Sequence, residues 1–272
     1  MAVVTISRHI GSLGSEVAQT LAKTMSYRLL DRESLEKSLA AYGISALHLE
    51  RYDEKKPSFW EVFSSERDRY LHYLKTVFLE AARQGNCVIL GRGGQVLMGD
   101  VPGVLHVRCV APLELRVARV QERYSCGNRQ AEQIIRQSDH DRYGFHKFFF
   151  NVNWESPSLY DVILNTKSFS LAGAVAVLQE ALDALQQGTD PQRTAAKLAD
   201  LWLAQQVETG ILYQALIPVN FLETSAQDGV VTLKGVVSAS ANIDRCQAAA
   251  GKVPGVKKVV NLISVIDNYL AM

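Results

Sequence analysis

The sequence predicts an α/β protein, a parallel sheet with helices on both faces, followed by a smaller α+β module. Short apolar runs alternate with helical stretches up to about residue 185, and this order is typical of a parallel sheet. A polar, helix-breaking stretch follows at 186–195, and beyond it Asp228-Gly229 joins two apolar strands as a hairpin signal. We therefore expect one domain at 1–185, a linker at 186–195 and a second domain at 196–268.

The composition limits the classes of protein to which this chain can belong. The chain has 272 residues, a formal net charge of +1 and 47% hydrophobic residues, which is ordinary for a soluble globular protein. Bulk charge favours neither a nucleic-acid partner nor a membrane surface. The four cysteines are scattered and lack metal-type spacing, and the first residues already form a core strand rather than a signal peptide. We expect reduced thiols and a cytoplasmic location.

The strands of the first domain can be placed in order. They are expected at Val3–Ile6, Tyr27–Asp31, Cys87–Leu90, Val104–Val110 and Asp161–Asn165. In the fourth strand His106 and Arg108 alternate with apolar residues, which predicts a strand less buried than the third. Between the second and third strands the pattern is helical, with aromatic residues whose spacing favours helix packing: Tyr52, Phe59, Trp60, Phe63, Tyr70, Tyr73 and Phe78.

A glycine turn between the first strand and the following helix is the main candidate site. Glycines let backbone N–H groups approach an anion, and a helix start adds unpaired N–H groups. Against the motif G-x-x-x-x-G-K-[ST], His9 occupies the first glycine position, Ser15 the lysine and Glu16 the hydroxyl. An ordinary tight turn is the alternative. Because Arg8, Asp31 and Arg92 also fall at the carboxyl ends of strands, where such sheets bind ligands, a nucleotide site gains support.

The segment from Pro112 to Phe150 is dense in arginine and contains Arg116, Arg119, Arg123, Arg129, Arg136 and Arg142. Arg116, Arg119 and Arg123 are spaced i, i+3, i+7 and share one helix face. A solvated basic face balanced by glutamates explains any single one of them. For the whole set, after a strand of a nucleotide-binding sheet, a phosphate clamp is the better interpretation.

Taken together, these motifs resemble the cytidylate kinase-like family, P-loop proteins similar to the nucleoside monophosphate kinases that phosphorylate CMP. The string that carries the resemblance runs through residues 1–185: Ile6-Ser7-Arg8, Gly11-Ser12-Leu13-Gly14, Leu30-Asp31-Arg32-Glu33, Gly91-Arg92-Gly93-Gly94, Ser138-Asp139-His140-Asp141-Arg142 and Pro157–Thr166. The resemblance implies a five-stranded parallel sheet, an acceptor-binding helical insert at about 32–84 and a helical lid at about 124–150.

The resemblance also implies roles for residues, with ATP and Mg²⁺ as cofactors and nucleotides as substrates. The donor phosphates would lie on the loop Gly11, Ser12, Leu13, Gly14, Ser15 and Glu16. The acceptor would meet Asp31, Arg32 and Arg92. Catalysis would fall to Arg123, Arg129, Asp141 and Arg142 of the lid, to which we add Arg8 for its place beside the loop in sequence, and no dedicated metal ligand is implied.

Ser15 departs from the family pattern, which has a cation at that position. Arg8 is the nearest cation in sequence that can substitute for it. Three functions therefore compete: a kinase for a nucleoside monophosphate, with CMP or dCMP favoured; a nucleotide-binding sensor without catalysis; and a kinase for another small acceptor.

The C-terminal segment has the order αββαβ and resembles a BON domain over about 196–268. It holds seven Lys/Arg and seven Asp/Glu from residue 186 onward, so it has little attraction for anionic lipid. We interpret it as a regulatory or assembly module, for a protein partner or a homo-oligomer. Its expected apolar core is Leu201, Phe221, Leu222, Val231, Leu233, Val259, Leu262 and Val265.

Overall fold

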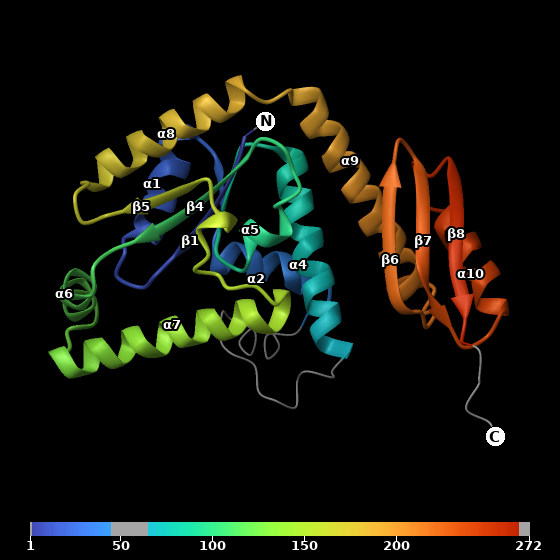
Figure 1. Ribbon diagram of the computed structural model, residues 1–272, viewed down its shortest axis with the longest axis horizontal. Helices are drawn as coiled ribbons and strands as arrows, with labels where there is room; N and C mark the ends of the chain where they lie inside the picture. The colour runs from blue at the N-terminus through green and yellow to red at the C-terminus, as the bar shows by residue number, and fades with distance from the viewer. Residues whose placement is uncertain (1, 45–64, 267–272) are drawn as a thin grey trace. The chain divides into compact units, whose positions relative to one another are not determined.

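The computed structural model describes residues 2–44 and 65–266, and the chain divides into two compact units, Met1–Thr194 and Ala195–Met272 (Figure 1). Helix α8 (Leu171–Gln187) ends one turn before helix α9 (Pro191–Glu208) begins. The expected linker 186–195 is thus largely helical. Asp190 starts α9, because its side chain accepts a hydrogen bond from the Gln192 amide at 2.9 Å and its carbonyl accepts one from the Thr194 amide.

A parallel sheet forms the centre of the first unit (Figure 1). Within the described residues it has five strands: β1 (Val3–Arg8), β2 (Arg28–Leu30), β3 (Cys87–Leu90), β4 (Val104–Val110) and β5 (Val162–Asn165). Their order is β2-β3-β1-β4-β5, and every pairing is parallel. The expected sheet is confirmed. Its order places the loop after β1 between the ends of β3 and β4.

Helices cover both faces of this sheet. Helix α1 (Gly14–Met25) packs with α8 on one face, around a core that includes Val17, Leu21 and Leu178. Helices α4 (Ser65–Gln84) and α5 (Gly94–Leu97) pack against β3 and β1. Helix α2 (Arg32–Ala41) follows β2. The aromatic residues Tyr70, Tyr73 and Phe78 are buried, as their spacing predicted, whereas Tyr52, Phe59, Trp60 and Phe63 lie outside the described residues.

Strand β4 differs from expectation because both of its polar side chains are buried. His106 is 8% exposed and Arg108 5% exposed. His106 Nδ1 lies 2.8 Å from Thr5 Oγ1, and its backbone amide donates to Asp161. Arg108 is held by Glu155. The prediction of a less buried strand was wrong, because hydrogen bonds from the His106 ring and from both Nη atoms of Arg108 offset the cost of burying these side chains.

One long helix, α7 (Asn128–Phe150), stands where the lid was expected, and a shorter helix, α6 (Leu113–Tyr124), precedes it. Helix α6 follows β4, and α7 is 23 residues long. Val117 and Val120 of α6 pack against Ala131 and Ile135 of α7 in a small apolar cluster. At its other end α7 places Phe150 against Gly93, where an added Cβ would lie 2.2 Å from the ring. Helix α7 therefore joins α6 to the turn after β3.

The second unit contains a three-stranded sheet in the order β6-β7-β8. The elements after α9 are η3 (Thr209–Gln214), β6 (Asn220–Gln227), β7 (Val230–Val237), α10 (Ala241–Gly251) and β8 (Lys258–Val265). Strands β6 and β7 form the predicted hairpin around Asp228-Gly229, β7 and β8 are parallel, and the core contains Val231, Leu233 and Ile263. The predicted αββαβ order is confirmed.

Three residues of the expected core of this unit are exposed. Phe221 is 89% exposed because the register of β6 shifts between Asn220 and Glu223 and its own φ is +54°. Leu262 is 55% exposed because it precedes the buried Ile263, so that it points to the other face of the sheet. Val265, at the end of β8, is 37% exposed.

Two further expectations concern the thiols and the membrane. All four cysteines are free, and three of them are buried. In the described part of the chain, every helix is too short or too polar to cross a bilayer.

Candidate functional site

A cavity of about 820 Å³ lies over the loop between β1 and α1. The loop, the start of α1, the turn after β3, and helices α6 and α7 all contribute to its wall. It lies at the carboxyl ends of the parallel strands, where sheets of this type bind ligands. Of the fourteen predicted site residues, it brings together Arg8, Gly11, Leu13, Gly14, Ser15, Glu16, Arg32, Arg92, Arg123, Asp141 and Arg142.

The loop itself needs its glycines. Gly11 has φ +75°, and a Cβ there would lie 2.8 Å from the carbonyl oxygen of Arg116. At Gly14, the first residue of α1, a Cβ would lie 2.4 Å from Cβ of Arg8. The start of α1 therefore rests directly on the Arg8 side chain, and Arg8 itself lines the cavity. The Cβ and Cγ of Arg8 thus lie against the first residue of α1, a helix whose first-turn N–H groups have no partner within the helix.

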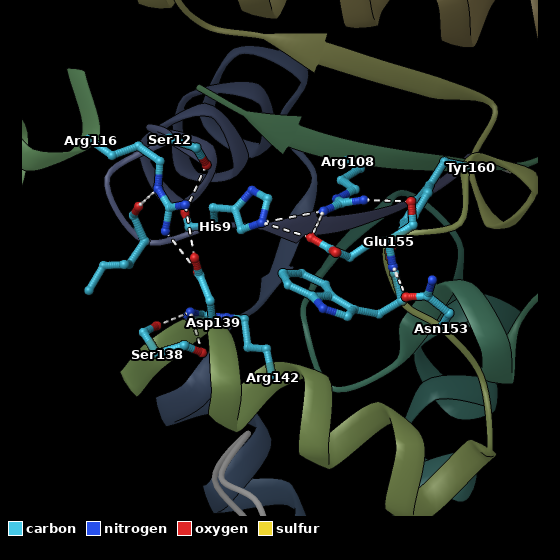
Figure 2. A network of polar contacts seen from close by, with 12 residues as sticks. His9, Ser12, Arg108, Arg116, Ser138, Asp139, Arg142, Asn153, Glu155 and Tyr160 are labelled. Atoms are coloured by element: carbon cyan, nitrogen blue, oxygen red, sulfur yellow. Dashed lines mark hydrogen bonds and ion pairs between the residues drawn. The ribbon is translucent and has the colours of Figure 1, made fainter. Parts of the chain in front are cut away.

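Two arginines of the expected phosphate clamp hold the loop instead. Arg116 is 6% exposed; its Nε donates to the Ile10 carbonyl at 2.8 Å, and its two Nη atoms bind Asp139 of α7 at 2.9 and 2.7 Å (Figure 2). Arg119 donates to the Gly11 carbonyl at 3.0 Å and to Thr166. Neither lines the cavity. The clamp hypothesis is thus wrong for these two, because protein acceptors already occupy their guanidinium groups.

His9 occupies the position of the first glycine and belongs to a network that the sequence did not reveal (Figure 2). Its Nε2 lies 3.3 Å from Nη2 of Arg108, which also binds Glu155 at 3.0 Å. The His9 ring meets Trp154 edge-on at 5.1 Å, and the Arg108 guanidinium lies 4.8 Å from the Trp154 ring. Burial, aided by nearby arginines, lowers the pKa of His9 to about 4 although Asp139 opposes the shift, so the ring is neutral at pH 7.

Because Arg108 can only donate, this 3.3 Å contact is a hydrogen bond when His9 Nε2 carries no proton, a state that the neutral ring permits. The sequence signal for this network was weak. His9 and Arg108 are distant in sequence, and only pairing of β1 with β4 aligns their strands.

Arg92 lies in a strained turn at the end of β3. Gly91, Arg92 and Gly93 have φ of +77°, +53° and +73°, a run of left-handed residues that is costly for the arginine. Arg92 is 2% exposed, lines the cavity and donates to the Tyr70 hydroxyl at 3.1 Å. Backbone strain of this kind is found mainly at functional sites, where the surrounding structure compensates for its free-energy cost.

Helix α7 forms a long wall of the cavity. Its lining residues recur at helical spacing: Gln130, Gln133, Ile134, Gln137, Ser138, Asp141 and Arg142. Arg142 contacts the Ser138 hydroxyl, and Gln137 donates to Asp141 at 2.9 Å. The charged residues, Asp141 and Arg142, lie at the C-terminal end of this row, close in sequence to Asp139, which binds Arg116. Amide side chains line the other end.

Three predicted site residues lie elsewhere. Ser12 is fully buried and donates its hydroxyl to the His9 carbonyl at 2.8 Å, so it shapes the loop rather than facing a ligand. Asp31 is the N-cap of α2, where its carboxylate accepts from the Ser34 amide and hydroxyl. Arg129 is exposed, outside the cavity lining.

The ionisable lining is mainly cationic. Five arginines, Arg8, Arg32, Arg92, Arg123 and Arg142, face two carboxylates, Glu16 and Asp141. Arg123 lies 3.6 Å from Glu16. An anion with several negative charges suits this wall. Residues 2–44 and 65–266 contain no cluster of three or more His, Cys, Asp or Glu side chains placed to hold a metal ion.

Comparisons with known proteins agree with this geometry. The model of the cytidylate kinase-like family matches residues 3–168, and that of the BON domain matches residues 199–267. A protein of Ignicoccus hospitalis named cytidylate kinase is 31% identical over 66% of this chain and 96% of its own length. One of the same name from Pyrobaculum islandicum is 24% identical over 65% and 90%. The crystal structure of an uncharacterized protein from Eubacterium ventriosum has 22% identity and a TM-score of 0.55, covering 67% of this chain and 98% of that chain, and shows the same fold.

Proposed function

Because the chain belongs to the cytidylate kinase-like family, we propose that its first unit transfers a phosphoryl group from ATP to a nucleoside monophosphate, with CMP or dCMP as the acceptor. One observation carries the proposal: a glycine loop at a helix start and five arginines line the same cavity. Phosphoryl transfer needs little beyond positioning and neutralisation of charge, which are what such a cavity provides.

The roles follow from the places of the residues around the cavity. The loop from Gly11 to Ser15 receives the donor phosphates with its N–H groups. Arg8, which supports the helix start, stands in for the missing loop lysine. Arg92, held by Tyr70, orients the acceptor phosphate, and Arg32, which lines the same cavity, assists it.

In the transfer, an oxygen of the acceptor phosphate attacks the γ-phosphorus of ATP. A new P–O bond forms, the bond to the β–γ bridging oxygen breaks, and ADP leaves with that oxygen. Arg123 and Arg142 neutralise the charge that spreads over the transferring group. Helix α7, which carries Arg142 and Asp141, shields the reacting atoms from water.

The lining fits Mg²⁺, which usually takes one or two carboxylates together with substrate phosphates. Bound mainly through the substrate phosphates, the ion would find oxygen ligands in the lining in the carboxylates of Glu16 and Asp141 and the hydroxyl of Ser15. When bound, the ion neutralises phosphate charge.

A second candidate is a nucleotide sensor that binds ATP without turnover. Ser15, at the lysine position, favours it, since loss of the loop cation removes transition-state stabilisation. In either case the BON-like unit would act as the regulatory or assembly module, in the cytoplasm. A third candidate is phosphorylation of another small acceptor, because P-loop kinases share this scaffold while the insert sets the specificity.

One experiment separates these candidates. ADP release is measured with purified protein, ATP, Mg²⁺ and a panel of acceptors, namely CMP, dCMP, UMP, AMP and non-nucleotide alcohols, and ATP affinity is measured by calorimetry. Turnover with CMP or dCMP supports the proposal. ATP binding without turnover supports the sensor, and absence of all nucleotide binding rejects both.

A further inference from the structure

Side chains from other elements hold three successive carbonyl groups of the loop. Arg116 of α6 donates to the Ile10 carbonyl at 2.8 Å, and Arg119 of α6 donates to the Gly11 carbonyl at 3.0 Å. The hydroxyl of Thr166, just after β5, donates to the Ser12 carbonyl at 3.0 Å. Arg119 also donates to the Thr166 hydroxyl and carbonyl, so that two of the three contacts support each other.

These contacts come from outside the cavity. Arg116 and Thr166 are 6% and 1% exposed, and Arg116, Arg119 and Thr166 do not line it. In a trans peptide the carbonyl of one residue points opposite to the N–H of the next, and the described chain has no cis peptide bond. Because side chains outside the cavity hold the Ile10 and Ser12 carbonyls, the N–H groups of Gly11 and Leu13 point in the opposite direction. Gly11 and Leu13 line the cavity, so these N–H groups face a ligand bound there.

The loop has particular need of such support. A loop held only by its own backbone is free to rotate its peptide groups, and Gly11 and Gly14 make this rotation easier. In this loop the Ser12 amide donates to the His9 carbonyl at 3.3 Å, the Ser12 hydroxyl donates to the same carbonyl, and no lysine side chain is present. The close approach of Gly11 to the backbone of Arg116 shows that the loop is seated against α6.

We propose that Arg116, Arg119 and Thr166 are positioning residues that hold the loop amides in the phosphate-binding orientation before a nucleotide arrives. The inference rests on the proposed function, since it concerns the same loop. It gives these arginines a role different from phosphate contact: they bind the protein's own carbonyl groups. Preorganised N–H groups bind an anion without the free-energy cost of ordering the loop at the moment of binding.

Thr166 offers the cleanest test. Thr166→Val removes the hydroxyl at nearly constant volume, and Thr166→Ser retains it. Thr194 is a matched control, because its hydroxyl also donates to a carbonyl, that of Pro102 at 3.0 Å, and it is 6% exposed but lies outside the cavity lining. In the full chain, hydrogen exchange of residues 9–14 without nucleotide, ATP affinity by calorimetry and Tm are measured for each variant.

We expect faster exchange of the loop in Thr166→Val and about 3–10-fold weaker ATP binding, as for loss of one buried hydrogen bond. Thr166→Ser should restore both. Thr194→Val should lower Tm with loop exchange and affinity unchanged. If Thr166→Val does not fold, Arg119→Lys, which keeps the charge but loses the forked geometry, takes its place with the same expectations.

Unchanged loop exchange or unchanged affinity in Thr166→Val overturns the inference while the proposed function stands. Equal effects of Thr194→Val and Thr166→Val on affinity also overturn it, since the effect is then one of stability alone. Failure of the natural protein to bind ATP rejects the proposed function, and the inference with it, and the affinity of the unmodified chain identifies that case before any variant is compared.

Discussion

Arg116 and Asp139 form a two-point ion pair that joins α6 to α7, with Nη–Oδ distances of 2.9 and 2.7 Å, while the same arginine holds the Ile10 carbonyl. Asp139→Asn removes the charge and leaves a buried guanidinium poorly paired. Since the Asp139 side chain is 31% exposed, we expect a loss of about 1–3 kcal/mol in the free energy of unfolding, below the range for a fully buried pair. Urea unfolding measures it.

The matched control for this prediction is Glu132→Gln, which breaks an exposed pair with Arg136 on the same helix. That change should cost less than about 0.5 kcal/mol. Hydrogen exchange along α7 should rise in Asp139→Asn alone. Equal losses in the two variants would show that the buried pair contributes nothing special.

Arg92 should discriminate between the two substrates. Arg92→Ala is expected to weaken nucleoside monophosphate binding at least tenfold, because a charge-assisted bidentate contact is lost, with ATP binding nearly unchanged. Calorimetry with each ligand separately is the measurement. Arg129→Ala, which alters an exposed arginine away from the cavity, should leave both affinities as they were. A parallel loss of both ligands in Arg92→Ala would count against the acceptor role.

Arg8 and Ser15 decide between kinase and sensor. If the chain is a kinase, Arg8→Ala should raise the barrier by roughly 2–4 kcal/mol, and Ser15→Lys should rescue or increase turnover. ADP release and ATP affinity are measured together. The sensor predicts no turnover in the natural protein and only an affinity change in Arg8→Ala. Full turnover in Arg8→Ala would show that another cation serves the loop.

His9 makes stability depend on pH. The pKa of His9 is lowered to about 4 in the folded chain, below the ordinary value of 6.5, so the unfolded chain takes up a proton first as pH falls. The stabilisation is complete above pH 6.5 and is lost towards pH 4. Between pH 7 and pH 5 the natural protein should lose about 2 kcal/mol more than His9→Gln. His106, whose pKa burial also lowers, contributes in the same direction in both proteins, so the difference isolates His9.

The C-terminal unit should fold alone. Residues 190–272 carry their own core around Val231 and Leu233, and a fragment of that length should melt cooperatively by circular dichroism. Leu233→Ala should cost about 2–5 kcal/mol, whereas Leu262→Ala, at a position 55% exposed, should cost much less. A fragment that remains unfolded would place the domain boundary elsewhere.

Local sequence patterns sufficed for the strands, the glycine turn and the order of the second unit. Hydrophobic runs and turn residues act over a few positions, so β3 and β4 were placed to the residue. The partners of polar residues depend on which strands lie side by side, and no local pattern contains this information. The alternation of His106 and Arg108 with apolar residues therefore predicted a strand less buried than the third, although Glu155 and Trp154 cover Arg108.

The same limit applies to the arginines of α6. Their i, i+3, i+7 spacing correctly predicts that they share one helix face, but the prediction that this face binds phosphate was wrong for two of the three. In the fold Arg116 and Arg119 meet the loop, and only Arg123 of that set lines the cavity. In the second unit a register shift at Phe221 reversed the expected inward direction of that side chain, which a strict alternation could not anticipate.

Two of the contacts of helix α7 lie at the loop after β1 and at the turn after β3, namely that of Asp139 with Arg116 and that of Phe150 with Gly93. Between them the helix rises roughly 16 Å, so it acts as a spacer between the loop after β1 and the turn after β3. Insertion or deletion of one residue in this stretch would rotate one of the two residues by about 100° around the helix axis relative to the other. The number of residues between these two contacts is therefore far more constrained than the identity of the exposed residues. We expect natural or engineered variants to differ in sequence along this part of α7 before they differ in its length.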